Sequence, residues 1–176
     1  MKYGFSLTPF SIKNAPKIEI TGAIARQNNR LKITYSLVGT SRVIIPAATT
    51  PPIRQHDLWE HTCCEFFLRL KNSTKYWEFN LSPAGHWNVF CFSNYRQDMT
   101  EEIAFTSLPF QVLRQANLLQ LDLEVNLYKI MLPEQQLEVG ITTVVENCDR
   151  QLSYWALTHC GTEADFHHQD SFILDL

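Results

Sequence analysis

The stretch Leu119-Gln-Leu-Asp-Leu-Glu-Val-Asn-Leu127 decides the fold class of this sequence. Apolar side chains recur at every second position, and the polar ones between them fall on the opposite face, which is the pattern of a half-buried β-strand. The same alternation returns in residues 18–24, 31–37 and 137–145. Four strands are therefore predicted from periodicity alone.

Further strands are predicted at 58–70, 76–82 and 86–92, with shorter ones near 110–114, 151–157 and 171–175. Pro83-Ala84-Gly85 is expected to close a hairpin, with Gly85 at the positive φ that such a loop needs. A short helix is predicted over 97–104, capped by Asp98 or Thr100. With no βαβ alternation, the pattern favours a single all-β domain over residues 1–176, a two-sheet antiparallel β-sandwich of jelly-roll type with at most one short helix.

Composition and charge narrow the function. The 176 residues are 45% hydrophobic and 19% charged, as in an ordinary globular domain. A net charge of −3, with no stripe of lysine and arginine, argues against a nucleic-acid partner. No apolar run approaches the ~20 residues that span a bilayer, and the first residues lack the apolar run of a signal peptide. We expect no membrane partner and a cytoplasmic location.

Cysteines and histidines invite metal and disulfide interpretations. The five cysteines are odd in number, lack CxxC spacing and include an adjacent pair, so buried reduced thiols are expected instead of disulfides. Near the C-terminus, five potential ligands lie within ten residues: His159, Cys160, Asp165, His167 and His168. Their spacing matches no zinc motif, so we expect a loop that forms hydrogen bonds through its histidines and no metal or other cofactor.

Polar side chains interrupt the apolar strand predicted over 58–70. Alternation places Trp59, His61 and Glu65 on one face of it, and the hairpin that follows directs Glu78 and Asn80 outward. If these strands are neighbours, one sheet face carries an aromatic platform beside carboxylates and amides. A sugar needs such a surface, because its ring stacks on indole while its hydroxyls require directional partners.

The same residues permit other interpretations. Trp59 could be a half-buried structural tryptophan, with Glu65 and Glu78 solvated or paired with Arg69 or Lys75. Two carboxylates on neighbouring strands could also serve as the acid and nucleophile of a glycosidase. No GxSxG, GxGxxG, P-loop or HExxH motif is present to favour another chemistry.

Three segments carry a resemblance to a known family: Leu58-Trp-Glu-His-Thr-Cys-Cys-Glu-Phe-Phe-Leu68, then Tyr76-Trp-Glu-Phe-Asn-Leu-Ser-Pro-Ala-Gly85 with Trp87, and Ser153-Tyr-Trp-Ala-Leu157 followed by Asp165-Phe-His-His168. Over residues 55–176 the chain resembles the bacterial DOMON-like domains, which are similar to the family 9 carbohydrate-binding modules. The resemblance implies a β-sandwich whose relatives bind sugars or, in some branches, haem.

In family 9 modules two tryptophans and a carboxylate hold one sugar end. The resemblance implies that Trp59 and Glu65 match the first tryptophan and the carboxylate, and that Trp155 is the candidate for the second tryptophan. Haem binding would need methionine and histidine ligands, and Met99 and Met131 lie outside the matching motifs.

The leading hypothesis is a non-catalytic domain that binds a carbohydrate or a sugar-containing molecule. Its predicted pocket comprises Trp59, His61, Glu65, Glu78, Asn80 and Trp155. The alternative is a scaffolding β-sandwich whose exposed aromatic residues contact a protein partner, and a glycoside hydrolase is the third candidate.

Overall fold

The computed structural model describes residues 2–13 and 15–176. Within these ranges the secondary structure is almost entirely strand, the helical elements are short 3₁₀ turns, and no α-helix is present. The strands are β1 (Lys2–Pro9), β2 (Glu19–Gln27), β3 (Arg30–Val38), β4 (Cys63–Leu70), β5 (Tyr76–Leu81), β6 (Trp87–Phe92), β7 (Thr100–Glu101), β8 (Phe110–Gln115), β9 (Leu118–Asn126), β10 (Leu137–Glu146), β11 (Leu152–Ala156) and β12 (Leu174–Asp175). The turns are η1 (Thr40–Arg42), η2 (Leu58–Glu60) and η3 (Gln169–Ser171). The predicted all-β class is confirmed.

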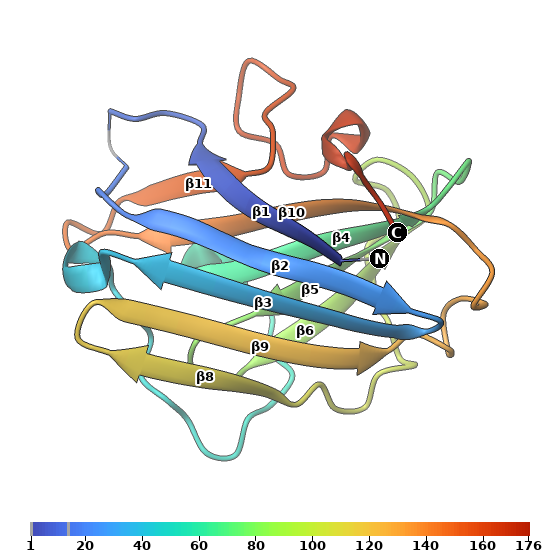
Figure 1. The fold of residues 1–176 in the computed structure, drawn as a ribbon, viewed down its shortest axis with the longest axis horizontal. Helices are drawn as coiled ribbons and strands as arrows, with labels where there is room; N and C mark the ends of the chain where they lie inside the picture. Colours follow the sequence, from blue (N-terminus) through green and yellow to red (C-terminus); the bar gives the residue numbers. More distant parts are fainter. Residues whose placement is uncertain (1, 14) are drawn as a thin grey trace.

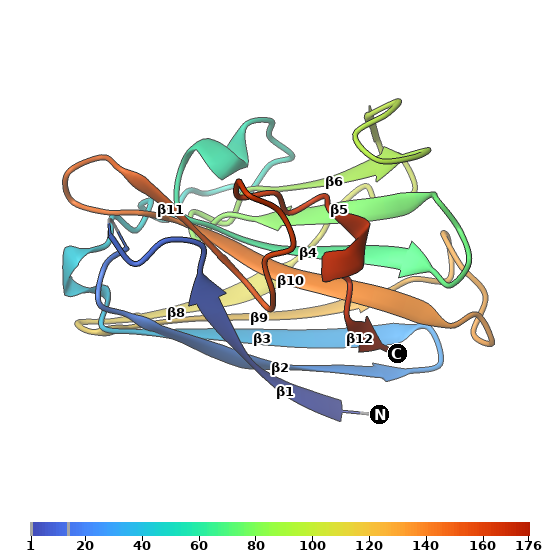
Figure 2. The same ribbon diagram turned by 90° about the horizontal axis from the view of Figure 1, so that it is seen from above.

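The strands follow one continuous hydrogen-bonded path, β7-β6-β5-β4-β10-β11-β1-β2-β3-β9-β8, with β12 beside β10 (Figure 1). Strand β1 joins the two halves of this path, because it pairs with β2 from Lys2 to Leu7 and with β11 through Thr8 and Pro9. The sheet therefore curls on itself, and its halves face each other (Figure 2). This curled half-barrel departs from the predicted sandwich, which has two separate sheets.

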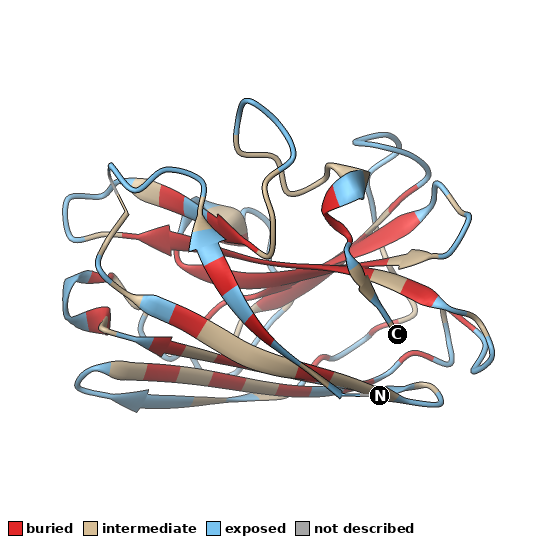
Figure 3. Cartoon of the chain, turned by 45° about the horizontal axis from the view of Figure 1, so that its top comes forward, coloured by how far each residue is buried: buried red, intermediate tan, exposed pale blue. Residues whose placement is uncertain are grey.

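The main core fills the space between the two halves. Strands β3 and β9 show how alternation produces it, since Ile33 and Tyr35 are buried opposite Leu123 and Leu121. Burying one such side chain stabilises the fold by roughly 1.5–3 kcal/mol. The Tyr35 hydroxyl also donates a 2.6 Å hydrogen bond to the carbonyl oxygen of Glu65, which links the halves across the core. Figure 3 shows that β4, β5 and β10 are buried along nearly their whole length.

Each predicted range contains a strand in the structure, although the strands begin or end at other residues than predicted. The hairpin between β5 and β6 forms as expected, and Gly85 has a φ of 101°. The strand predicted over 58–70 starts only at Cys63, because Leu58–Glu60 forms η2. Trp59 therefore lies on a 3₁₀ turn and not on the strand of Glu65.

The helix predicted over 97–104 is wrong. Asp98 has a left-handed φ of 52°, which a helix cannot contain, and its carboxylate accepts a 2.5 Å hydrogen bond from the Ser93 hydroxyl. Beyond it, Thr100–Glu101 forms β7 and pairs with Phe90 and Cys91 at the edge of the sheet. The free hydrogen-bonding edge of β6 thus takes this segment as a strand.

The cysteines are unpaired, and their burial is mixed. Cys63 and Cys64 are buried, as predicted, and Cys91 is half-buried. The expectation of burial is wrong for Cys148 and Cys160, which are exposed in connecting segments outside the strands. Within the same described ranges, no helix has the length and apolar character needed to cross a membrane.

A second, smaller apolar cluster lies on the outer face of β4, β5 and β6. Phe67, Tyr76, Phe90, Phe92 and Phe172 form it, and Trp59 and Phe166 pack against it. Phe172 stacks on Phe67 with ring centroids 5.5 Å apart, which holds the C-terminal segment over the sheet. Figure 2 shows this segment crossing above β10 and β4. The outer face is therefore covered only in part, and the uncovered part is the site described next.

Candidate functional site

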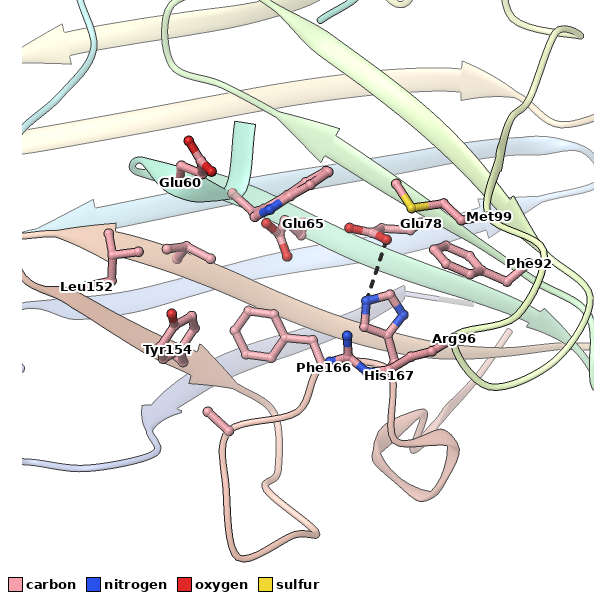
Figure 4. A pocket seen from close by; sticks show the side chains of 13 residues that line it. Glu60, Glu65, Glu78, Phe92, Arg96, Met99, Leu152, Tyr154, Phe166 and His167 are labelled. Carbon is pink, nitrogen blue, oxygen red and sulfur yellow. Dashed lines mark ion pairs between the residues drawn. The ribbon is translucent and has the colours of Figure 1, made fainter. Parts of the chain in front are cut away.

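A pocket of about 520 Å³ opens on this outer face. Its size is within the range of roughly 300–1,000 Å³ typical of small-molecule sites. Strands β4, β5, β10 and β11 contribute its floor, while η2, the loop after β6 and the C-terminal segment contribute its walls (Figure 4). The lining side chains are Trp59, Glu60, Glu65, Glu78, Phe92, Arg96, Met99, Val144, Leu152, Tyr154, Ala164, Phe166 and His167.

Strand register places two carboxyl groups on the floor. Glu65 of β4 is opposite Asn80 of β5, and Phe67 is opposite Glu78, so Glu65 and Glu78 lie diagonally on neighbouring strands. Diagonal side chains on one sheet face lie within reach of one another. Figure 4 shows both carboxyl groups directed into the pocket.

Glu65 is 2% exposed and only weakly bonded. Its Oε2 is 3.5 Å from the Thr142 hydroxyl, and its Oε1 has no hydrogen-bond partner among the described residues. Burial, followed by the negative charge of Glu78, raises the pKa of this carboxyl well above its usual range. Glu65 thus presents an unsatisfied oxygen at the bottom of the pocket.

Glu78 is better supported. Its Oε1 accepts a 3.0 Å hydrogen bond from Asn80 Nδ2, and its Oε2 lies 3.8 Å from Nε2 of His167. Burial raises the pKa of Glu78 to about 7, and the Asn80 hydrogen bond and the charge of Arg96 limit that rise. The carboxyl therefore keeps its proton to a higher pH than a free glutamic acid does.

His167 forms the wall beside Glu78. Its Nδ1 is 2.9 Å from the Tyr76 hydroxyl, and that hydroxyl accepts the backbone N–H of Arg96 at 3.1 Å. Burial lowers the pKa of His167 to about 4, so the imidazole is neutral at neutral pH. If Tyr76 donates its own proton to Nδ1, both groups are satisfied, and Nε2 carries the proton on the side of Glu78.

Arg96 brings the one guanidinium among the described lining residues. Its Nη2 is 2.8 Å from Oδ1 of Asp165, and the Tyr95 hydroxyl donates a 2.7 Å hydrogen bond to the other oxygen of that carboxylate. These contacts lower the pKa of Asp165 despite its partial burial. The positive charge at the rim is therefore already paired.

Aromatic rings form the walls above the carboxyl groups. The Trp59 ring packs edge to face on Phe90, with centroids 5.8 Å apart, and Phe166 packs on Tyr154 at the same distance. In Figure 4 the rings of Tyr154 and Phe166 are on one side of the floor and that of Phe92 is on the other. The pocket thus combines flat apolar walls with a polar floor.

The structure brings together three of the six predicted site residues. Trp59, Glu65 and Glu78 line the pocket, and Asn80 is fully buried beneath it with its Oδ1 unpaired among the described residues. His61 lies outside the lining, where its Nδ1 is 2.8 Å from a carboxylate oxygen of Glu146.

Trp155 does not reach the pocket. It is 5% exposed within the main core, and its indole N–H donates a 3.0 Å hydrogen bond to Ser153 Oγ. Neighbouring residues of β11 point to opposite faces, so Tyr154 lines the pocket in its place.

Sequence reasoning missed several pocket residues, above all Arg96, Phe166 and His167. Phe166 and His167 stand in the last resembling segment, which was the one available signal for them. Their contacts depend on a loop that folds back over the sheet, and Arg96 lies in another loop at a left-handed φ of 52°.

The C-terminal histidines and their neighbours have separate partners. His159 Nε2 is 2.9 Å from the carbonyl oxygen of Thr8, Asp165 pairs with Arg96, and His167 contacts Tyr76. Hydrogen bonding through His159 and His167 is confirmed, whereas Nδ1 of His168 has no hydrogen-bond partner among the described residues. In the part of the chain that the structure describes, no group of three His, Cys, Asp or Glu side chains is arranged to hold a metal ion.

No protein-family model matches the chain, and no curated protein matches its sequence. Similar folds are found among solved structures. One is a "putative carbohydrate-binding protein" from Bacteroides uniformis, with a TM-score of 0.67 and 13% identity over 97% of this chain and 84% of that chain.

A family 9 carbohydrate-binding module from Caldicellulosiruptor kristjanssonii is also similar, with a TM-score of 0.50 and 9% identity in two structures. The complex with glucose covers 82% of this chain and 69% of the module, and the complex with cellotriose covers 86% and 71%. The predicted likeness to family 9 modules is confirmed at the level of the fold, and the DOMON-like assignment stays a prediction.

Proposed function

We propose that this protein binds a carbohydrate or a sugar-containing molecule, without chemical conversion, in the pocket over β4 and β5. The observation that carries the proposal is the pairing of aromatic walls with two buried carboxyl groups in one pocket of about 520 Å³. The fold shared with carbohydrate-binding proteins supports it.

The pocket offers each kind of contact that a sugar ring needs. The Trp59 ring at the wall gives the C–H face of a pyranose a surface for stacking. On the floor, Glu65 Oε1 and Glu78 Oε2 accept hydrogen bonds from ligand hydroxyls, and the Nε2 proton of His167 donates one.

The test is titration calorimetry of the protein against neutral mono- and oligosaccharides, including glucose and cellotriose. We expect a dissociation constant on the order of micromolar to millimolar, or roughly −8 to −4 kcal/mol. Trp59→Ala should abolish binding, and Glu65→Gln should weaken it by about 1–3 kcal/mol. Tyr128→Ala, which removes an exposed ring outside the pocket, is the matched control and should bind as the wild type does. A wild type that binds no sugar, or a Trp59→Ala variant that binds normally, would contradict the proposal.

One observation favours glycoside hydrolysis as a second candidate. Glu78, with its pKa raised to about 7, has the property of a general acid, and Glu65 lies on the neighbouring strand. Release of chromophore from aryl glycosides by the wild type, and its loss in Glu78→Gln, would establish that activity. If concentrated protein binds sugar but does not hydrolyse aryl glycosides, binding alone is the function.

A further inference from the structure

Resting on that proposed function, we propose that the ligand carries a cationic amino group, as an amino sugar does, and that this group binds between Glu65 and Glu78. Carbohydrate binding alone does not require a charge on the ligand. The composition of the pocket floor does favour one, on three separate grounds.

The first ground is hydrogen bonding. Glu65 Oε1 is buried, faces the pocket and has no partner among the described residues, and Glu78 Oε2 has only the 3.8 Å approach of His167. Leaving a buried acceptor without a hydrogen-bond partner is unfavourable. A group with several donors satisfies both oxygens at once, and an ammonium has three donors and no acceptor.

The second ground is charge. Three carboxyl groups, those of Glu60, Glu65 and Glu78, line the pocket, and no lysine is present among the described lining residues. The guanidinium of Arg96 is paired with Asp165, and burial keeps His167 neutral. Toward the two buried carboxyl groups, β10 presents the uncharged Thr142, and β4 and β5 present the uncharged Cys63 and Asn80. Apart from the paired Arg96, the described lining residues supply no positive charge to these carboxyl groups, and a cationic ligand would add one.

The third ground is the walls. The rings of Trp59, Phe92, Tyr154 and Phe166 line the pocket around the carboxyl groups. The face of an aromatic ring attracts a cation, and the attraction is stronger where water is excluded. A neutral hydroxyl gains nothing comparable from these walls.

The experiment compares three probes that differ in one substituent: glucosamine, glucose and N-acetylglucosamine. Calorimetry at about pH 6, where an amine is fully protonated, should give glucosamine an affinity at least about ten-fold higher than that of the other two. Binding of the ammonium should release on the order of one proton per site from the two carboxyl groups, because a nearby cation favours their ionised form. Repeating the titration in buffers of different ionisation enthalpy counts that proton.

Glu65→Gln and Glu78→Gln should each remove the preference for glucosamine and the proton release. Gln keeps the shape of Glu and one acceptor oxygen, so both variants should fold. If a variant fails to fold, the proton release measured on the wild type still tests the proposal. Glu134→Gln, which removes an exposed carboxyl that does not line the pocket, is the matched control and should keep the preference. If glucose binds as tightly as glucosamine, the amino group is not recognised although the proposed function stands. If none of the probes and no neutral sugar binds, both proposals fail.

Discussion

At the scale of single residues, Glu65 and Glu78 decide what the pocket can bind. The two carboxyl groups are 2% and 4% exposed, and neither has a full set of partners. A buried acid without a counter-charge holds its proton to higher pH than a free acid does. Their protonation therefore affects both ligand binding and the stability of the fold.

Replacing Glu78 should change how stability depends on pH. Burial raises its pKa from 4.5 to about 7, so between these values the folded chain binds more protons there than the unfolded chain. Stability from this carboxyl is present below about pH 4.5 and is lost as pH rises to about 7. His167, with its pKa lowered to about 4, has the opposite slope from there to about pH 6.5. The wild-type curve therefore contains two opposed contributions.

The difference between Glu78→Gln and the wild type isolates the contribution of the acid. We expect the variant to gain on the order of 2–3 kcal/mol relative to the wild type between about pH 5 and 7.5. Urea denaturation at several pH values measures this difference. Glu134→Gln should show a flat difference over the same range, and a flat result for Glu78→Gln would mean that its carboxyl ionises normally in the fold.

At the scale of strands, close packing in the curled sheet constrains β2. A Cβ on Gly22 would collide with the Phe5 ring and the Thr34 carbonyl oxygen, whereas a Cβ on Gly4 would meet nothing nearer than 3.8 Å. Gly22→Ala should therefore destabilise the protein by about 2–3 kcal/mol, and Gly4→Ala, in the adjacent strand, should cost less than about 1 kcal/mol. Chemical denaturation of the two variants checks this. Equal stabilities would show that β2 can move away from both Phe5 of β1 and Thr34 of β3 at no cost.

Strands were predictable where alternation within one segment was long, as in β3 and β9. The three residues Leu58–Glu60 could not be distinguished from the strand that follows, because a 3₁₀ turn has no apolar period of its own. Trp155 was expected in the pocket because of the family resemblance, and no strand pattern corrected that expectation. Strand β11 has a pocket on one side and the core on the other, so its sequence does not distinguish the two faces.

The loop residues of the pocket were less predictable still. Arg96 and His167 are both positioned by contacts with Tyr76, and Arg96 is also positioned by its pairing with Asp165. In each of these pairs the two residues are far apart in the sequence. Local patterns carry no information about such pairs. The floor of the site could therefore be predicted, and most of its walls could not.

At the scale of the whole molecule, the thiols report how the sheet shields its contents. Cys148 and Cys160 are exposed, whereas Cys63 and Cys64 are buried and have raised pKa values. In native protein a thiol reagent should label the two exposed cysteines rapidly and the buried pair only after unfolding, because the thiolate is the reactive form. Mass spectrometry of the peptides identifies the labelled cysteines. Rapid labelling of the buried pair in native protein would indicate that β4 opens easily.

The pocket is built outside the core on which the fold depends. Its lining side chains project from the outer face of the sheet, away from the main core, and from the turns and loops beside that face. Substitutions of Trp59 or Phe166 should therefore change ligand affinity more than they change the stability of the fold. This separation is consistent with a shared fold among chains that are only 9% to 13% identical.

The position of the pocket's C-terminal wall in the sequence determines when the pocket is completed during protein synthesis. Ala164, Phe166 and His167 follow β11 in the chain, so the ribosome adds them after almost the whole sheet has been made. A chain that ends at β11 therefore contains every residue of the pocket floor, but it lacks the C-terminal wall of the pocket and also lacks β12 and the buried Phe172. The residues that complete the pocket are therefore synthesised after all the residues of its floor.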